Sequence, residues 1–248
     1  MAESKGRSSL RLVTYNIHKG IGGIDRKYRP ERIIRVLKAC RADLILLQEV
    51  DEGVPRSRGD RQVDLLGDAL GMEHRAYFPN VFLKRGRYGN AILSRYPLDH
   101  HENIDLTRRL RKRRGALHAR LTVPNGSRRF RLWVYNVHLG LAETERRSQL
   151  RSLLGWHAGH RVHASTVVLL AGDFNDVWRK LGRGMLEPAG FQGLPTRPRT
   201  FPAVRPLRPL DAVFVRGPAR FSRQGTGAAD LVREASDHLP IVVSLRLG

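Results

Sequence analysis

The chain has 248 residues, 41% of them hydrophobic and 27% charged, which is enough to bury the core of one large soluble domain without a disulfide or a structural metal. Its single cysteine, Cys40, excludes an internal disulfide framework and a cysteine-based zinc site. The 45 Lys and Arg residues outnumber the 23 Asp and Glu residues and give a net charge of +22, which predicts a polyanionic partner, although a compositionally biased genome would also scatter arginines along the chain.

The N-terminus is predicted to be a disordered segment over residues 1–9, followed by one domain over residues 10–248. The first 13 residues contain no apolar run like that of a signal peptide. No apolar run in the chain approaches the roughly 20 residues that cross a bilayer. We therefore expect a cytoplasmic protein.

The first half of the chain alternates short apolar strands with amphipathic helices. Residues 10–18 predict a strand, 29–42 a helix that buries the inert thiol of Cys40, and 43–50 a strand covered on both faces. Further along, a helix is predicted at 62–70 and strands at 74–81, 88–94, 116–123 and 129–138. The run "RRLRKRRG" at 108–115 is the densest positive charge and is expected to bind an anionic partner.

The second half continues with a helix at 143–160, a strand at 165–174 and a shorter helix at 177–187. Residues 188–210 are rich in Pro and Gly and predict a long loop. Two last strands are expected at 210–215 and 240–247. Alternating strands and helices with stretches of successive strands predict an α/β protein whose sheets are covered by helices.

A weak internal repeat relates the two halves. The segments "RLVTYNIHKG" at 11–20 and "RLWVYNVHLG" at 131–140 share the frame R-L-x-x-Y-N-x-H-x-G. The match indicates two related halves, each of which delivers an Asn and a His from the end of a strand.

Polar side chains stand at the ends of six predicted strands; four sets follow a strand, whereas Asp211 opens one and the segment at 236–238 precedes the last. They are Asn16 and His18, Gln48 and Glu49, Asn136 and His138, Asp173 and Asn175, Asp211, and the segment "SDH" at 236–238. If these strands are neighbours that end at one edge, the side chains converge on one site. Each residue also has a simpler interpretation as a turn residue or a solvated strand end.

Carboxylate and amide oxygens are hard ligands that suit Mg²⁺ or Mn²⁺. Such a cation, together with a base and a protonated histidine, would overcome the charge repulsion that protects phosphodiesters from hydrolysis. The sequence has no HExxH helix, GxSxG elbow, P-loop or GxGxxG fingerprint, which argues against zinc peptidases, serine hydrolases and nucleotide-binding enzymes.

Nine short blocks, in order, resemble the endonuclease/exonuclease/phosphatase superfamily with its DNase I-like fold. They are "TYNIHKG", "LLQEV", "YGNAILS", "RRGAL", "NVHLG", "GDFN", "TFP", "LDAVFV" and "SDHLPI", and they span residues 14–241. The resemblance implies a four-layer α/β sandwich with two packed mixed β-sheets flanked by helices. It also implies a catalytic domain over 10–248 that hydrolyses phosphate esters with Mg²⁺ or Mn²⁺.

The resemblance also implies roles for individual residues. Glu49 corresponds to the principal metal ligand, with Asn16 and Asp237 beside it. Asp173 would position or deprotonate the attacking water. The phosphate would be held by Asn175.

The histidines and the outer residues are assigned in the same way. His238, oriented by Asp211, would stabilise the developing charge. His138 resembles a second catalytic histidine and argues against the abasic-site endonuclease branch, whereas His18 has no clear family role and is expected to be a turn or supporting residue. Supporting or substrate-binding positions are expected at Tyr88, Asn90, Arg114 and Asn136.

Charge favours a nucleic-acid substrate, DNA before RNA, with Arg111, Lys112 and Arg113 as backbone contacts. The alternative is a phospholipid-headgroup phosphodiesterase or phosphatase that acts at an anionic membrane. The sequence argues against it, because it has no amphipathic segment that could insert into a membrane, and "VFL" at 81–83 is too short for that purpose. A non-catalytic nucleic-acid-binding protein is disfavoured because every expected catalytic position is filled. No obligate protein partner is indicated.

Overall fold

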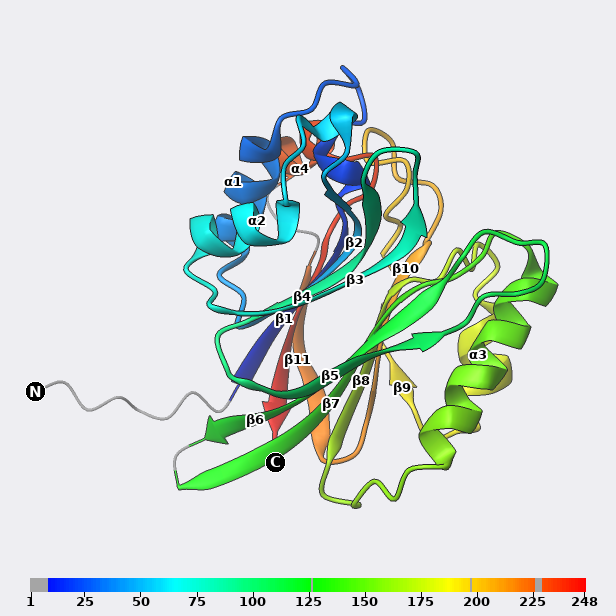
Figure 1. Cartoon of the computed structure of the whole chain (residues 1–248). Coiled ribbons are helices and arrows are strands. Elements are labelled where there is room, and N and C mark those ends of the chain that lie inside the picture. The colour runs from blue at the N-terminus through cyan, green and yellow to red at the C-terminus, as the bar shows by residue number, and fades with distance from the viewer. Residues whose placement is uncertain (1–8, 126, 197, 226–228) are drawn as a thin grey trace, which may run out of the picture.

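Two six-stranded β-sheets pack face to face and carry helices on their outer faces (Figure 1). The structure, a computed structural model, describes residues 9–125, 127–196, 198–225 and 229–248. The four layers confirm the α/β sandwich predicted from the sequence. Residues 1–8 of the predicted disordered segment lie outside the described residues, and Ser9 already belongs to the first strand.

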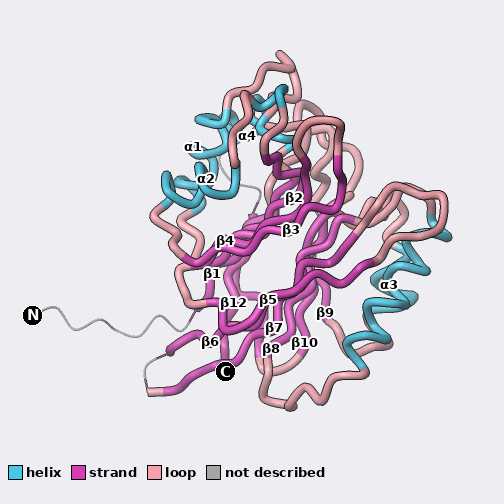
Figure 2. Tube along the Cα trace, in the orientation of Figure 1, coloured by secondary structure: helices cyan, strands magenta, loops and turns pink. Residues whose placement is uncertain are grey.

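The first sheet has the strand order β11-β12-β1-β2-β4-β3. Its strands are β1 (Ser9–Asn16), β2 (Leu44–Glu52), β3 (His74–Phe82), β4 (Arg87–Ser94), β11 (Ala219–Gly225) and β12 (Ile241–Leu247). Its outer face is covered by α1 (Pro30–Cys40), α2 (Gln62–Leu70) and α4 (Ala229–Ala235) (Figure 2). Cys40, the last residue of α1, is buried in the core between these helices and the sheet.

The second sheet has the order β5-β6-β7-β8-β10-β9. Its strands are β5 (Leu98–Asp105), β6 (Gly115–Asn125), β7 (Arg128–His138), β8 (Val167–Asp173), β9 (Gln192–Gly193) and β10 (Asp211–Arg216). Helix α3 (Glu143–Ala158) covers its outer face and buries Leu150 and Leu153 there. Among the described residues, α3 is the longest helix, and none is long and apolar enough to cross a membrane.

Side-chain alternation explains why the strands are apolar throughout. Leu12 and Leu46 point into the core between the sheets, while Val13 and Ile45 point outwards beneath the helices. Both faces of each central strand are therefore buried, and the strand sequences have no polar face.

The weak sequence repeat corresponds to a structural repeat. In the first sheet, the parallel pair β1-β2 lies between the antiparallel neighbours β12 and β4. In the second, the parallel pair β7-β8 lies between β6 and β10 in the same way. The two R-L-x-x-Y-N-x-H-x-G segments thus occupy equivalent central strands, β1 and β7.

The predicted elements were incomplete in five places. Strands β5, β9 and β11 and helix α4 were not expected, because their sequences are short or polar and partly exposed, and β9 lies within the predicted loop 188–210. The helix predicted at 177–187 is confined to 180–186, because the Asp176 carboxylate accepts a hydrogen bond from the Leu181 amide and holds the preceding residues in a turn.

Candidate active site

The ends of four central strands meet at one edge of the sandwich. β1 and β2 run parallel with Asn16 beside Gln48, and β7 and β8 run parallel with His138 beside Asp173. β10 begins at the same edge, with Asp211 opposite Asp173. We call this the active-site edge, and it brings together residues that are up to 222 positions apart, from Asn16 to His238.

Asp173 lies at the centre of this edge and is 2% exposed. Its Oδ2 accepts a hydrogen bond from Asn16 Nδ2 at 3.1 Å, across the two sheets. Its Oδ1 accepts one from the Asn175 amide at 2.9 Å. The Nε2 atoms of His138 and His238 lie 3.6 Å and 3.9 Å from Oδ2. The Asp173 carboxylate therefore accepts hydrogen bonds from two amide groups and lies close to two imidazole rings.

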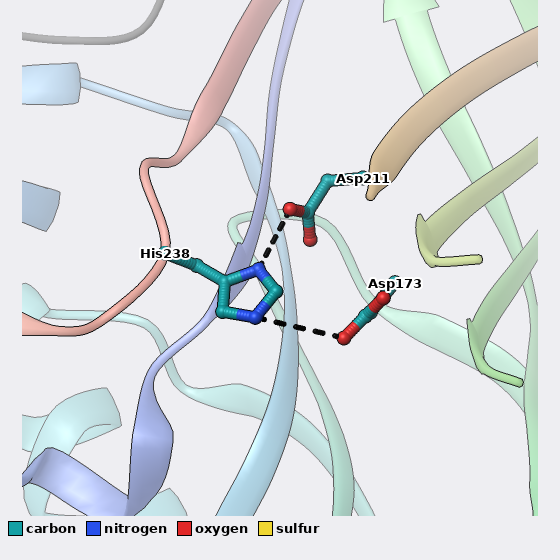
Figure 3. Close-up of side chains that lie close together, drawn as sticks. All are labelled: Asp173, Asp211 and His238. Carbon is teal, nitrogen blue, oxygen red and sulfur yellow. Dashed lines mark hydrogen bonds and ion pairs between the residues drawn. The ribbon is translucent and has the colours of Figure 1, made fainter. Parts of the chain in front are cut away.

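His238 is held by Asp211. The Nδ1 atom of His238 donates a hydrogen bond to Asp211 Oδ2 at 2.8 Å, and its Nε2 points towards Asp173 (Figure 3). Burial would lower the pKa of His238, but the charge of Asp211 and the hydrogen bond to it outweigh burial and raise the pKa to about 10. His238 is therefore an imidazolium at neutral pH.

Burial raises the pKa of the Asp173 carboxyl above its ordinary range; His238 opposes that rise and Asp211 adds to it. Burial, together with Arg114, holds the pKa of His138 well below its usual value, so this imidazole is neutral. Two histidines beside one carboxylate thus carry different charges, which is the pattern expected of groups with separate proton-transfer roles.

Glu49 occupies a strained position in a β-bulge of β2, where the pairing with β4 shifts between Leu47 and Val50. Its φ of 57° lies in the left-handed region, which non-glycine residues adopt at a cost of about 1–2 kcal/mol. The bulge turns the carboxylate towards the edge, and such strain is typical of functional sites.

Two side chains of the turn His18–Gly20 lie close to the carboxylates predicted to bind metal. Lys19 Nζ donates a hydrogen bond to Glu49 Oε2, and His18 Nδ1 lies 3.8 Å from Asp237 Oδ1. Burial would raise the pKa of Glu49, but the positive charges of His138, when protonated, and of Lys19 lower it to about 2. Since His138 is neutral at pH 7, Lys19 is the cation that compensates Glu49.

The donor set fits a hard divalent cation. Asn16, Glu49 and Asp237 offer amide and carboxylate oxygens, and the side chains of Glu49 and Asp237 remain 15% and 29% exposed. The ligand atoms of another group, Asp173, Asp211 and His238, lie within 4.8 Å of one another. In that group His238 Nδ1 already bonds Asp211, so proton handling suits it better than metal binding, although Asp211 Oδ1 is buried and has no hydrogen-bond partner among the described residues.

A shallow pocket next to Glu49 and His138 is lined by Tyr88, Asn90 and Arg114. Asn90 Nδ2 donates to the carbonyls of Gly115 and Asn136, both at 3.2 Å, so its amide fixes the pocket wall. Arg114 is 7% exposed, and its Nε is buried and has no hydrogen-bond partner in the described part of the chain. The structure therefore brings these three predicted supporting residues to the site.

Asn136 lies deeper than the sequence suggests. It is fully buried, and its Nδ2 donates to the carbonyls of Leu47 and Ala91 at 2.8 Å and 2.9 Å. Its Oδ1 accepts from Gln48 Nε2 at 2.7 Å. Asn136 therefore ties the second sheet to the first, as Asn16 ties the first to the second, and its saturated amide is out of reach of a substrate.

Asn175 follows Asp173 with a left-handed φ of 51°, a conformation that Asn tolerates well. Its Nδ2 donates to the Leu139 carbonyl at 3.0 Å, and the residue is 9% exposed.

The residues predicted to contact a nucleic-acid backbone, Arg111, Lys112 and Arg113, are exposed in the loop 106–114. The Lys112 ammonium lies 5.1 Å from the ring centroid of Tyr88. These residues therefore border the entrance of the site.

Two contributors were missing from the predicted site residues. Lys19 contacts Glu49, and Ser236 Oγ donates to the Asn16 carbonyl at 2.8 Å while it accepts from the His238 amide at 3.3 Å. Both belong to the sequence blocks "TYNIHKG" and "SDHLPI", at the ends of strands. A rule that counts every polar residue at a strand end would have found them.

Comparison with known proteins gives one family. The sequence model of the endonuclease/exonuclease/phosphatase family matches residues 13–238. The uncharacterized protein YbhP of Escherichia coli strain K12 is 31% identical over 259 aligned positions, which cover 100% of both chains.

Solved structures agree with this match. The crystal structure of an endonuclease/exonuclease/phosphatase from Beutenbergia cavernae has a TM-score of 0.81 and 25% identity, over 98% of this chain and 72% of that chain. ANGEL2, a 2',3'-cyclic phosphatase, has a TM-score of 0.74 and 14% identity over 96% of each chain. At the latter identity the likeness is one of fold alone.

Proposed function

Because the chain belongs to the endonuclease/exonuclease/phosphatase family, we propose that it is a hydrolase of phosphodiesters that depends on Mg²⁺ or Mn²⁺. One observation carries this proposal above the others. Asp173 is buried between the imidazolium of His238 and the neutral ring of His138, beside carboxylates that suit a divalent cation. This combination supplies a base, a positive charge and a metal site within one edge.

In the proposed reaction, Asp173 orients the attacking water and accepts its proton. The hydrogen bonds from Asn16 and the Asn175 amide hold the carboxylate in place. A carboxylate whose pKa is raised towards neutrality is a stronger base than an ordinary one, which suits this role.

His238 supplies positive charge opposite the phosphoryl oxygens, and Asp211 keeps that ring protonated and oriented. A bound Mg²⁺ or Mn²⁺, held by Glu49, Asn16 and Asp237, would neutralise the phosphate and stabilise the leaving oxygen. The new bond joins the water oxygen to phosphorus, and the ester P–O bond breaks. The products are a phosphate monoester and an alcohol.

Hydrolysis of bis(p-nitrophenyl) phosphate tests this chemistry without assuming a natural substrate. We expect turnover with Mg²⁺ or Mn²⁺, none in EDTA, and recovery when the metal is restored. Glu49→Gln should require a higher metal concentration for half-maximal rate, since it removes one negative ligand. Turnover that is unaffected by EDTA would refute the metal-dependent mechanism.

DNA is the substrate that the charge of the chain supports. Arg111, Lys112 and Arg113 are exposed beside the entrance, where they would meet a phosphate backbone. Incubation of supercoiled plasmid with Mg²⁺ or Mn²⁺ tests this substrate, and nicking that EDTA abolishes would support it. Intact plasmid under conditions in which bis(p-nitrophenyl) phosphate is hydrolysed would exclude DNA and leave the chemistry in place.

A phospholipid headgroup is the second candidate substrate. Its specific support is a set of exposed apolar side chains around the entrance of the site, which a DNA backbone would not contact.

A further inference from the structure

Exposed apolar side chains gather around the active site. Ten large hydrophobic side chains are exposed among the described residues, and eight of them lie in six segments at the active-site edge, namely 17–29, 82–86, 106–114, 139–142, 174–181 and 200–210. We take one residue from each segment as the rim residues: Ile24, Phe82, Leu110, Leu141, Trp178 and Leu207. Their exposed fractions run from 54% for Leu207 to 96% for Leu110.

Strand direction places all six segments at the same edge. Four follow the ends of β1, β3, β7 and β8 or include the last residue of the strand, and the other two precede β6 and β10, which begin at that edge. Each segment also lies within a few residues of the site, as Leu141 does after His138 and Trp178 after Asn175. The rim residues therefore lie at the same edge as the site, where a substrate must approach.

The same six segments are strongly basic. They contain twelve exposed Lys or Arg side chains and one exposed carboxylate, that of Asp25, which is paired with Arg32. Apolar and basic residues alternate at short range, as at Ile24 and Arg26, or at Leu110 between two arginines. The edge thus combines exposed apolar side chains with a positive field.

This combination matches the interface of an anionic bilayer. Apolar tips enter the boundary between headgroups and acyl chains, while basic side chains bind the negative surface. DNA matches the positive charge of this edge but not its exposed apolar side chains. Four of the six rim residues are aliphatic, whereas nucleic acids engage exposed side chains by stacking bases on aromatic rings. A protein partner seated on the rim would close the site without supplying a phosphodiester.

We infer that the rim docks onto an anionic membrane surface, and that the phosphodiester delivered to Asp173 belongs to a phospholipid headgroup. This inference rests on the proposed hydrolase activity for its substrate, but not for its docking surface. In the reaction, water adds to the phosphorus of the headgroup and one ester P–O bond breaks, which leaves a phosphate monoester and an alcohol.

Co-sedimentation with vesicles tests the docking surface. The whole chain is mixed in EDTA, which prevents turnover, with vesicles of phosphatidylcholine alone or with phosphatidylglycerol at about 7:3. We expect binding to the mixed vesicles and little to phosphatidylcholine alone. Leu110→Ser/Leu141→Ser should lower the partition coefficient about tenfold, because two apolar tips are removed.

Leu231→Ser is the matched control, since Leu231 is 39% exposed on α4, over the outer face of the first sheet. It should bind vesicles as the wild type does. The inference fails if the wild type remains in the supernatant, or if the rim double variant partitions like the wild type. It also fails if that variant weakens binding to duplex DNA and leaves vesicle binding unchanged.

Hydrolysis of bis(p-nitrophenyl) phosphate by the same variants separates this inference from the proposed function. The rim double variant should hydrolyse this soluble ester at the wild-type rate, because its residues lie outside the site. Vesicle binding by a protein that hydrolyses no ester would refute the hydrolase and the lipid substrate, and would leave the docking surface standing.

Discussion

The active-site edge and the opposite edge of the sandwich are both basic, but they differ in backbone strain and in exposed apolar side chains. Of nine described non-glycine residues with positive φ, eight lie at the active-site edge, and the ninth, Arg41, ends α1. The opposite edge exposes Arg128, Arg129, Arg131, Arg220 and Arg246. None of the exposed large hydrophobic side chains in the described parts of the chain lies at that opposite edge.

The comparison teaches that charge alone does not identify the functional edge. Among the described residues, strained backbone, buried carboxylates with shifted pKa values and exposed apolar side chains occur together only where the strands of the parallel pairs end. Strain and buried charge lower stability, so their concentration at one edge indicates a function that offsets the cost.

Among substitutions that keep the proposed base Asp173, removal of Asp211 should have the largest effect on the chemistry that distinguishes this edge. In Asp211→Asn, burial becomes the dominant influence on His238 and lowers its pKa, so the imidazolium is lost near neutral pH. We expect kcat to fall about 100-fold at pH 8, within the range attributed to one acid–base group. The pH–rate profile and an NMR titration of His238 measure both effects.

The direction of the pH dependence follows from the raised pKa. In the wild type, the ion pair of His238 with Asp211 contributes its full stabilisation below about pH 6.5, the ordinary pKa of histidine, and both the stabilisation and the imidazolium are lost as the pH rises through about 10. In Asp211→Asn, the rate should therefore begin to fall on the alkaline side of the pH–rate profile at a lower pH than in the wild type. An unchanged basic limb would show that His238 does not supply the charge.

Removal of three positive charges from either edge should have different effects on the affinity for duplex DNA. The expected factor is smaller than the fall in kcat of Asp211→Asn. Arg111→Ser/Lys112→Ser/Arg113→Ser should weaken binding to duplex DNA about tenfold and reduce the slope of log affinity against log salt by about 0.9 for each phosphate that is no longer neutralised. The opposite-edge variant Arg128→Ser/Arg129→Ser/Arg131→Ser is the control. Equal weakening in both variants would mean that polyanions bind by net charge, and the two edges would not differ in this respect.

Lys19 provides the smallest effect. Its ion pair with Glu49 Oε2 competes with a cation for that carboxylate. We expect Lys19→Met to bind Mn²⁺ about fivefold more tightly in isothermal titration, a factor that corresponds to about 1 kcal/mol for the lost ion pair. Weaker binding in Lys19→Met would instead assign Lys19 a supporting role in the metal site.

Most of the site could be predicted because its residues follow apolar strands in a recognisable order. Asn16, Glu49, Asp173 and Asp211 stand at strand ends, and strand direction alone brings them to one edge. The complete burial of Asn136 could not be predicted, because Asn136 and Asn16 occupy the same position in the shared pattern R-L-x-x-Y-N-x-H-x-G. Only the packing of the two sheets decides which of the two side-chain amides is covered.

The rim could not be predicted from any single segment. Ile24, Leu110 and Trp178 are isolated apolar residues in polar loops, and each alone is an ordinary exposed side chain. Their significance arises from six segments that meet only in the folded chain. The strain at Glu49 is hidden for the same reason, since the bulge in β2 depends on its pairing with β4.

Hydrolysis of bis(p-nitrophenyl) phosphate by Asp173→Asn, beside the wild type and the opposite-edge arginine variant, tests the central claim most directly. With saturating Mn²⁺, we predict a loss of about 1,000-fold or more in kcat for Asp173→Asn, with the melting temperature maintained, and no loss for the opposite-edge variant. A folded Asp173→Asn protein that keeps the wild-type rate would contradict the assignment of catalysis to this edge.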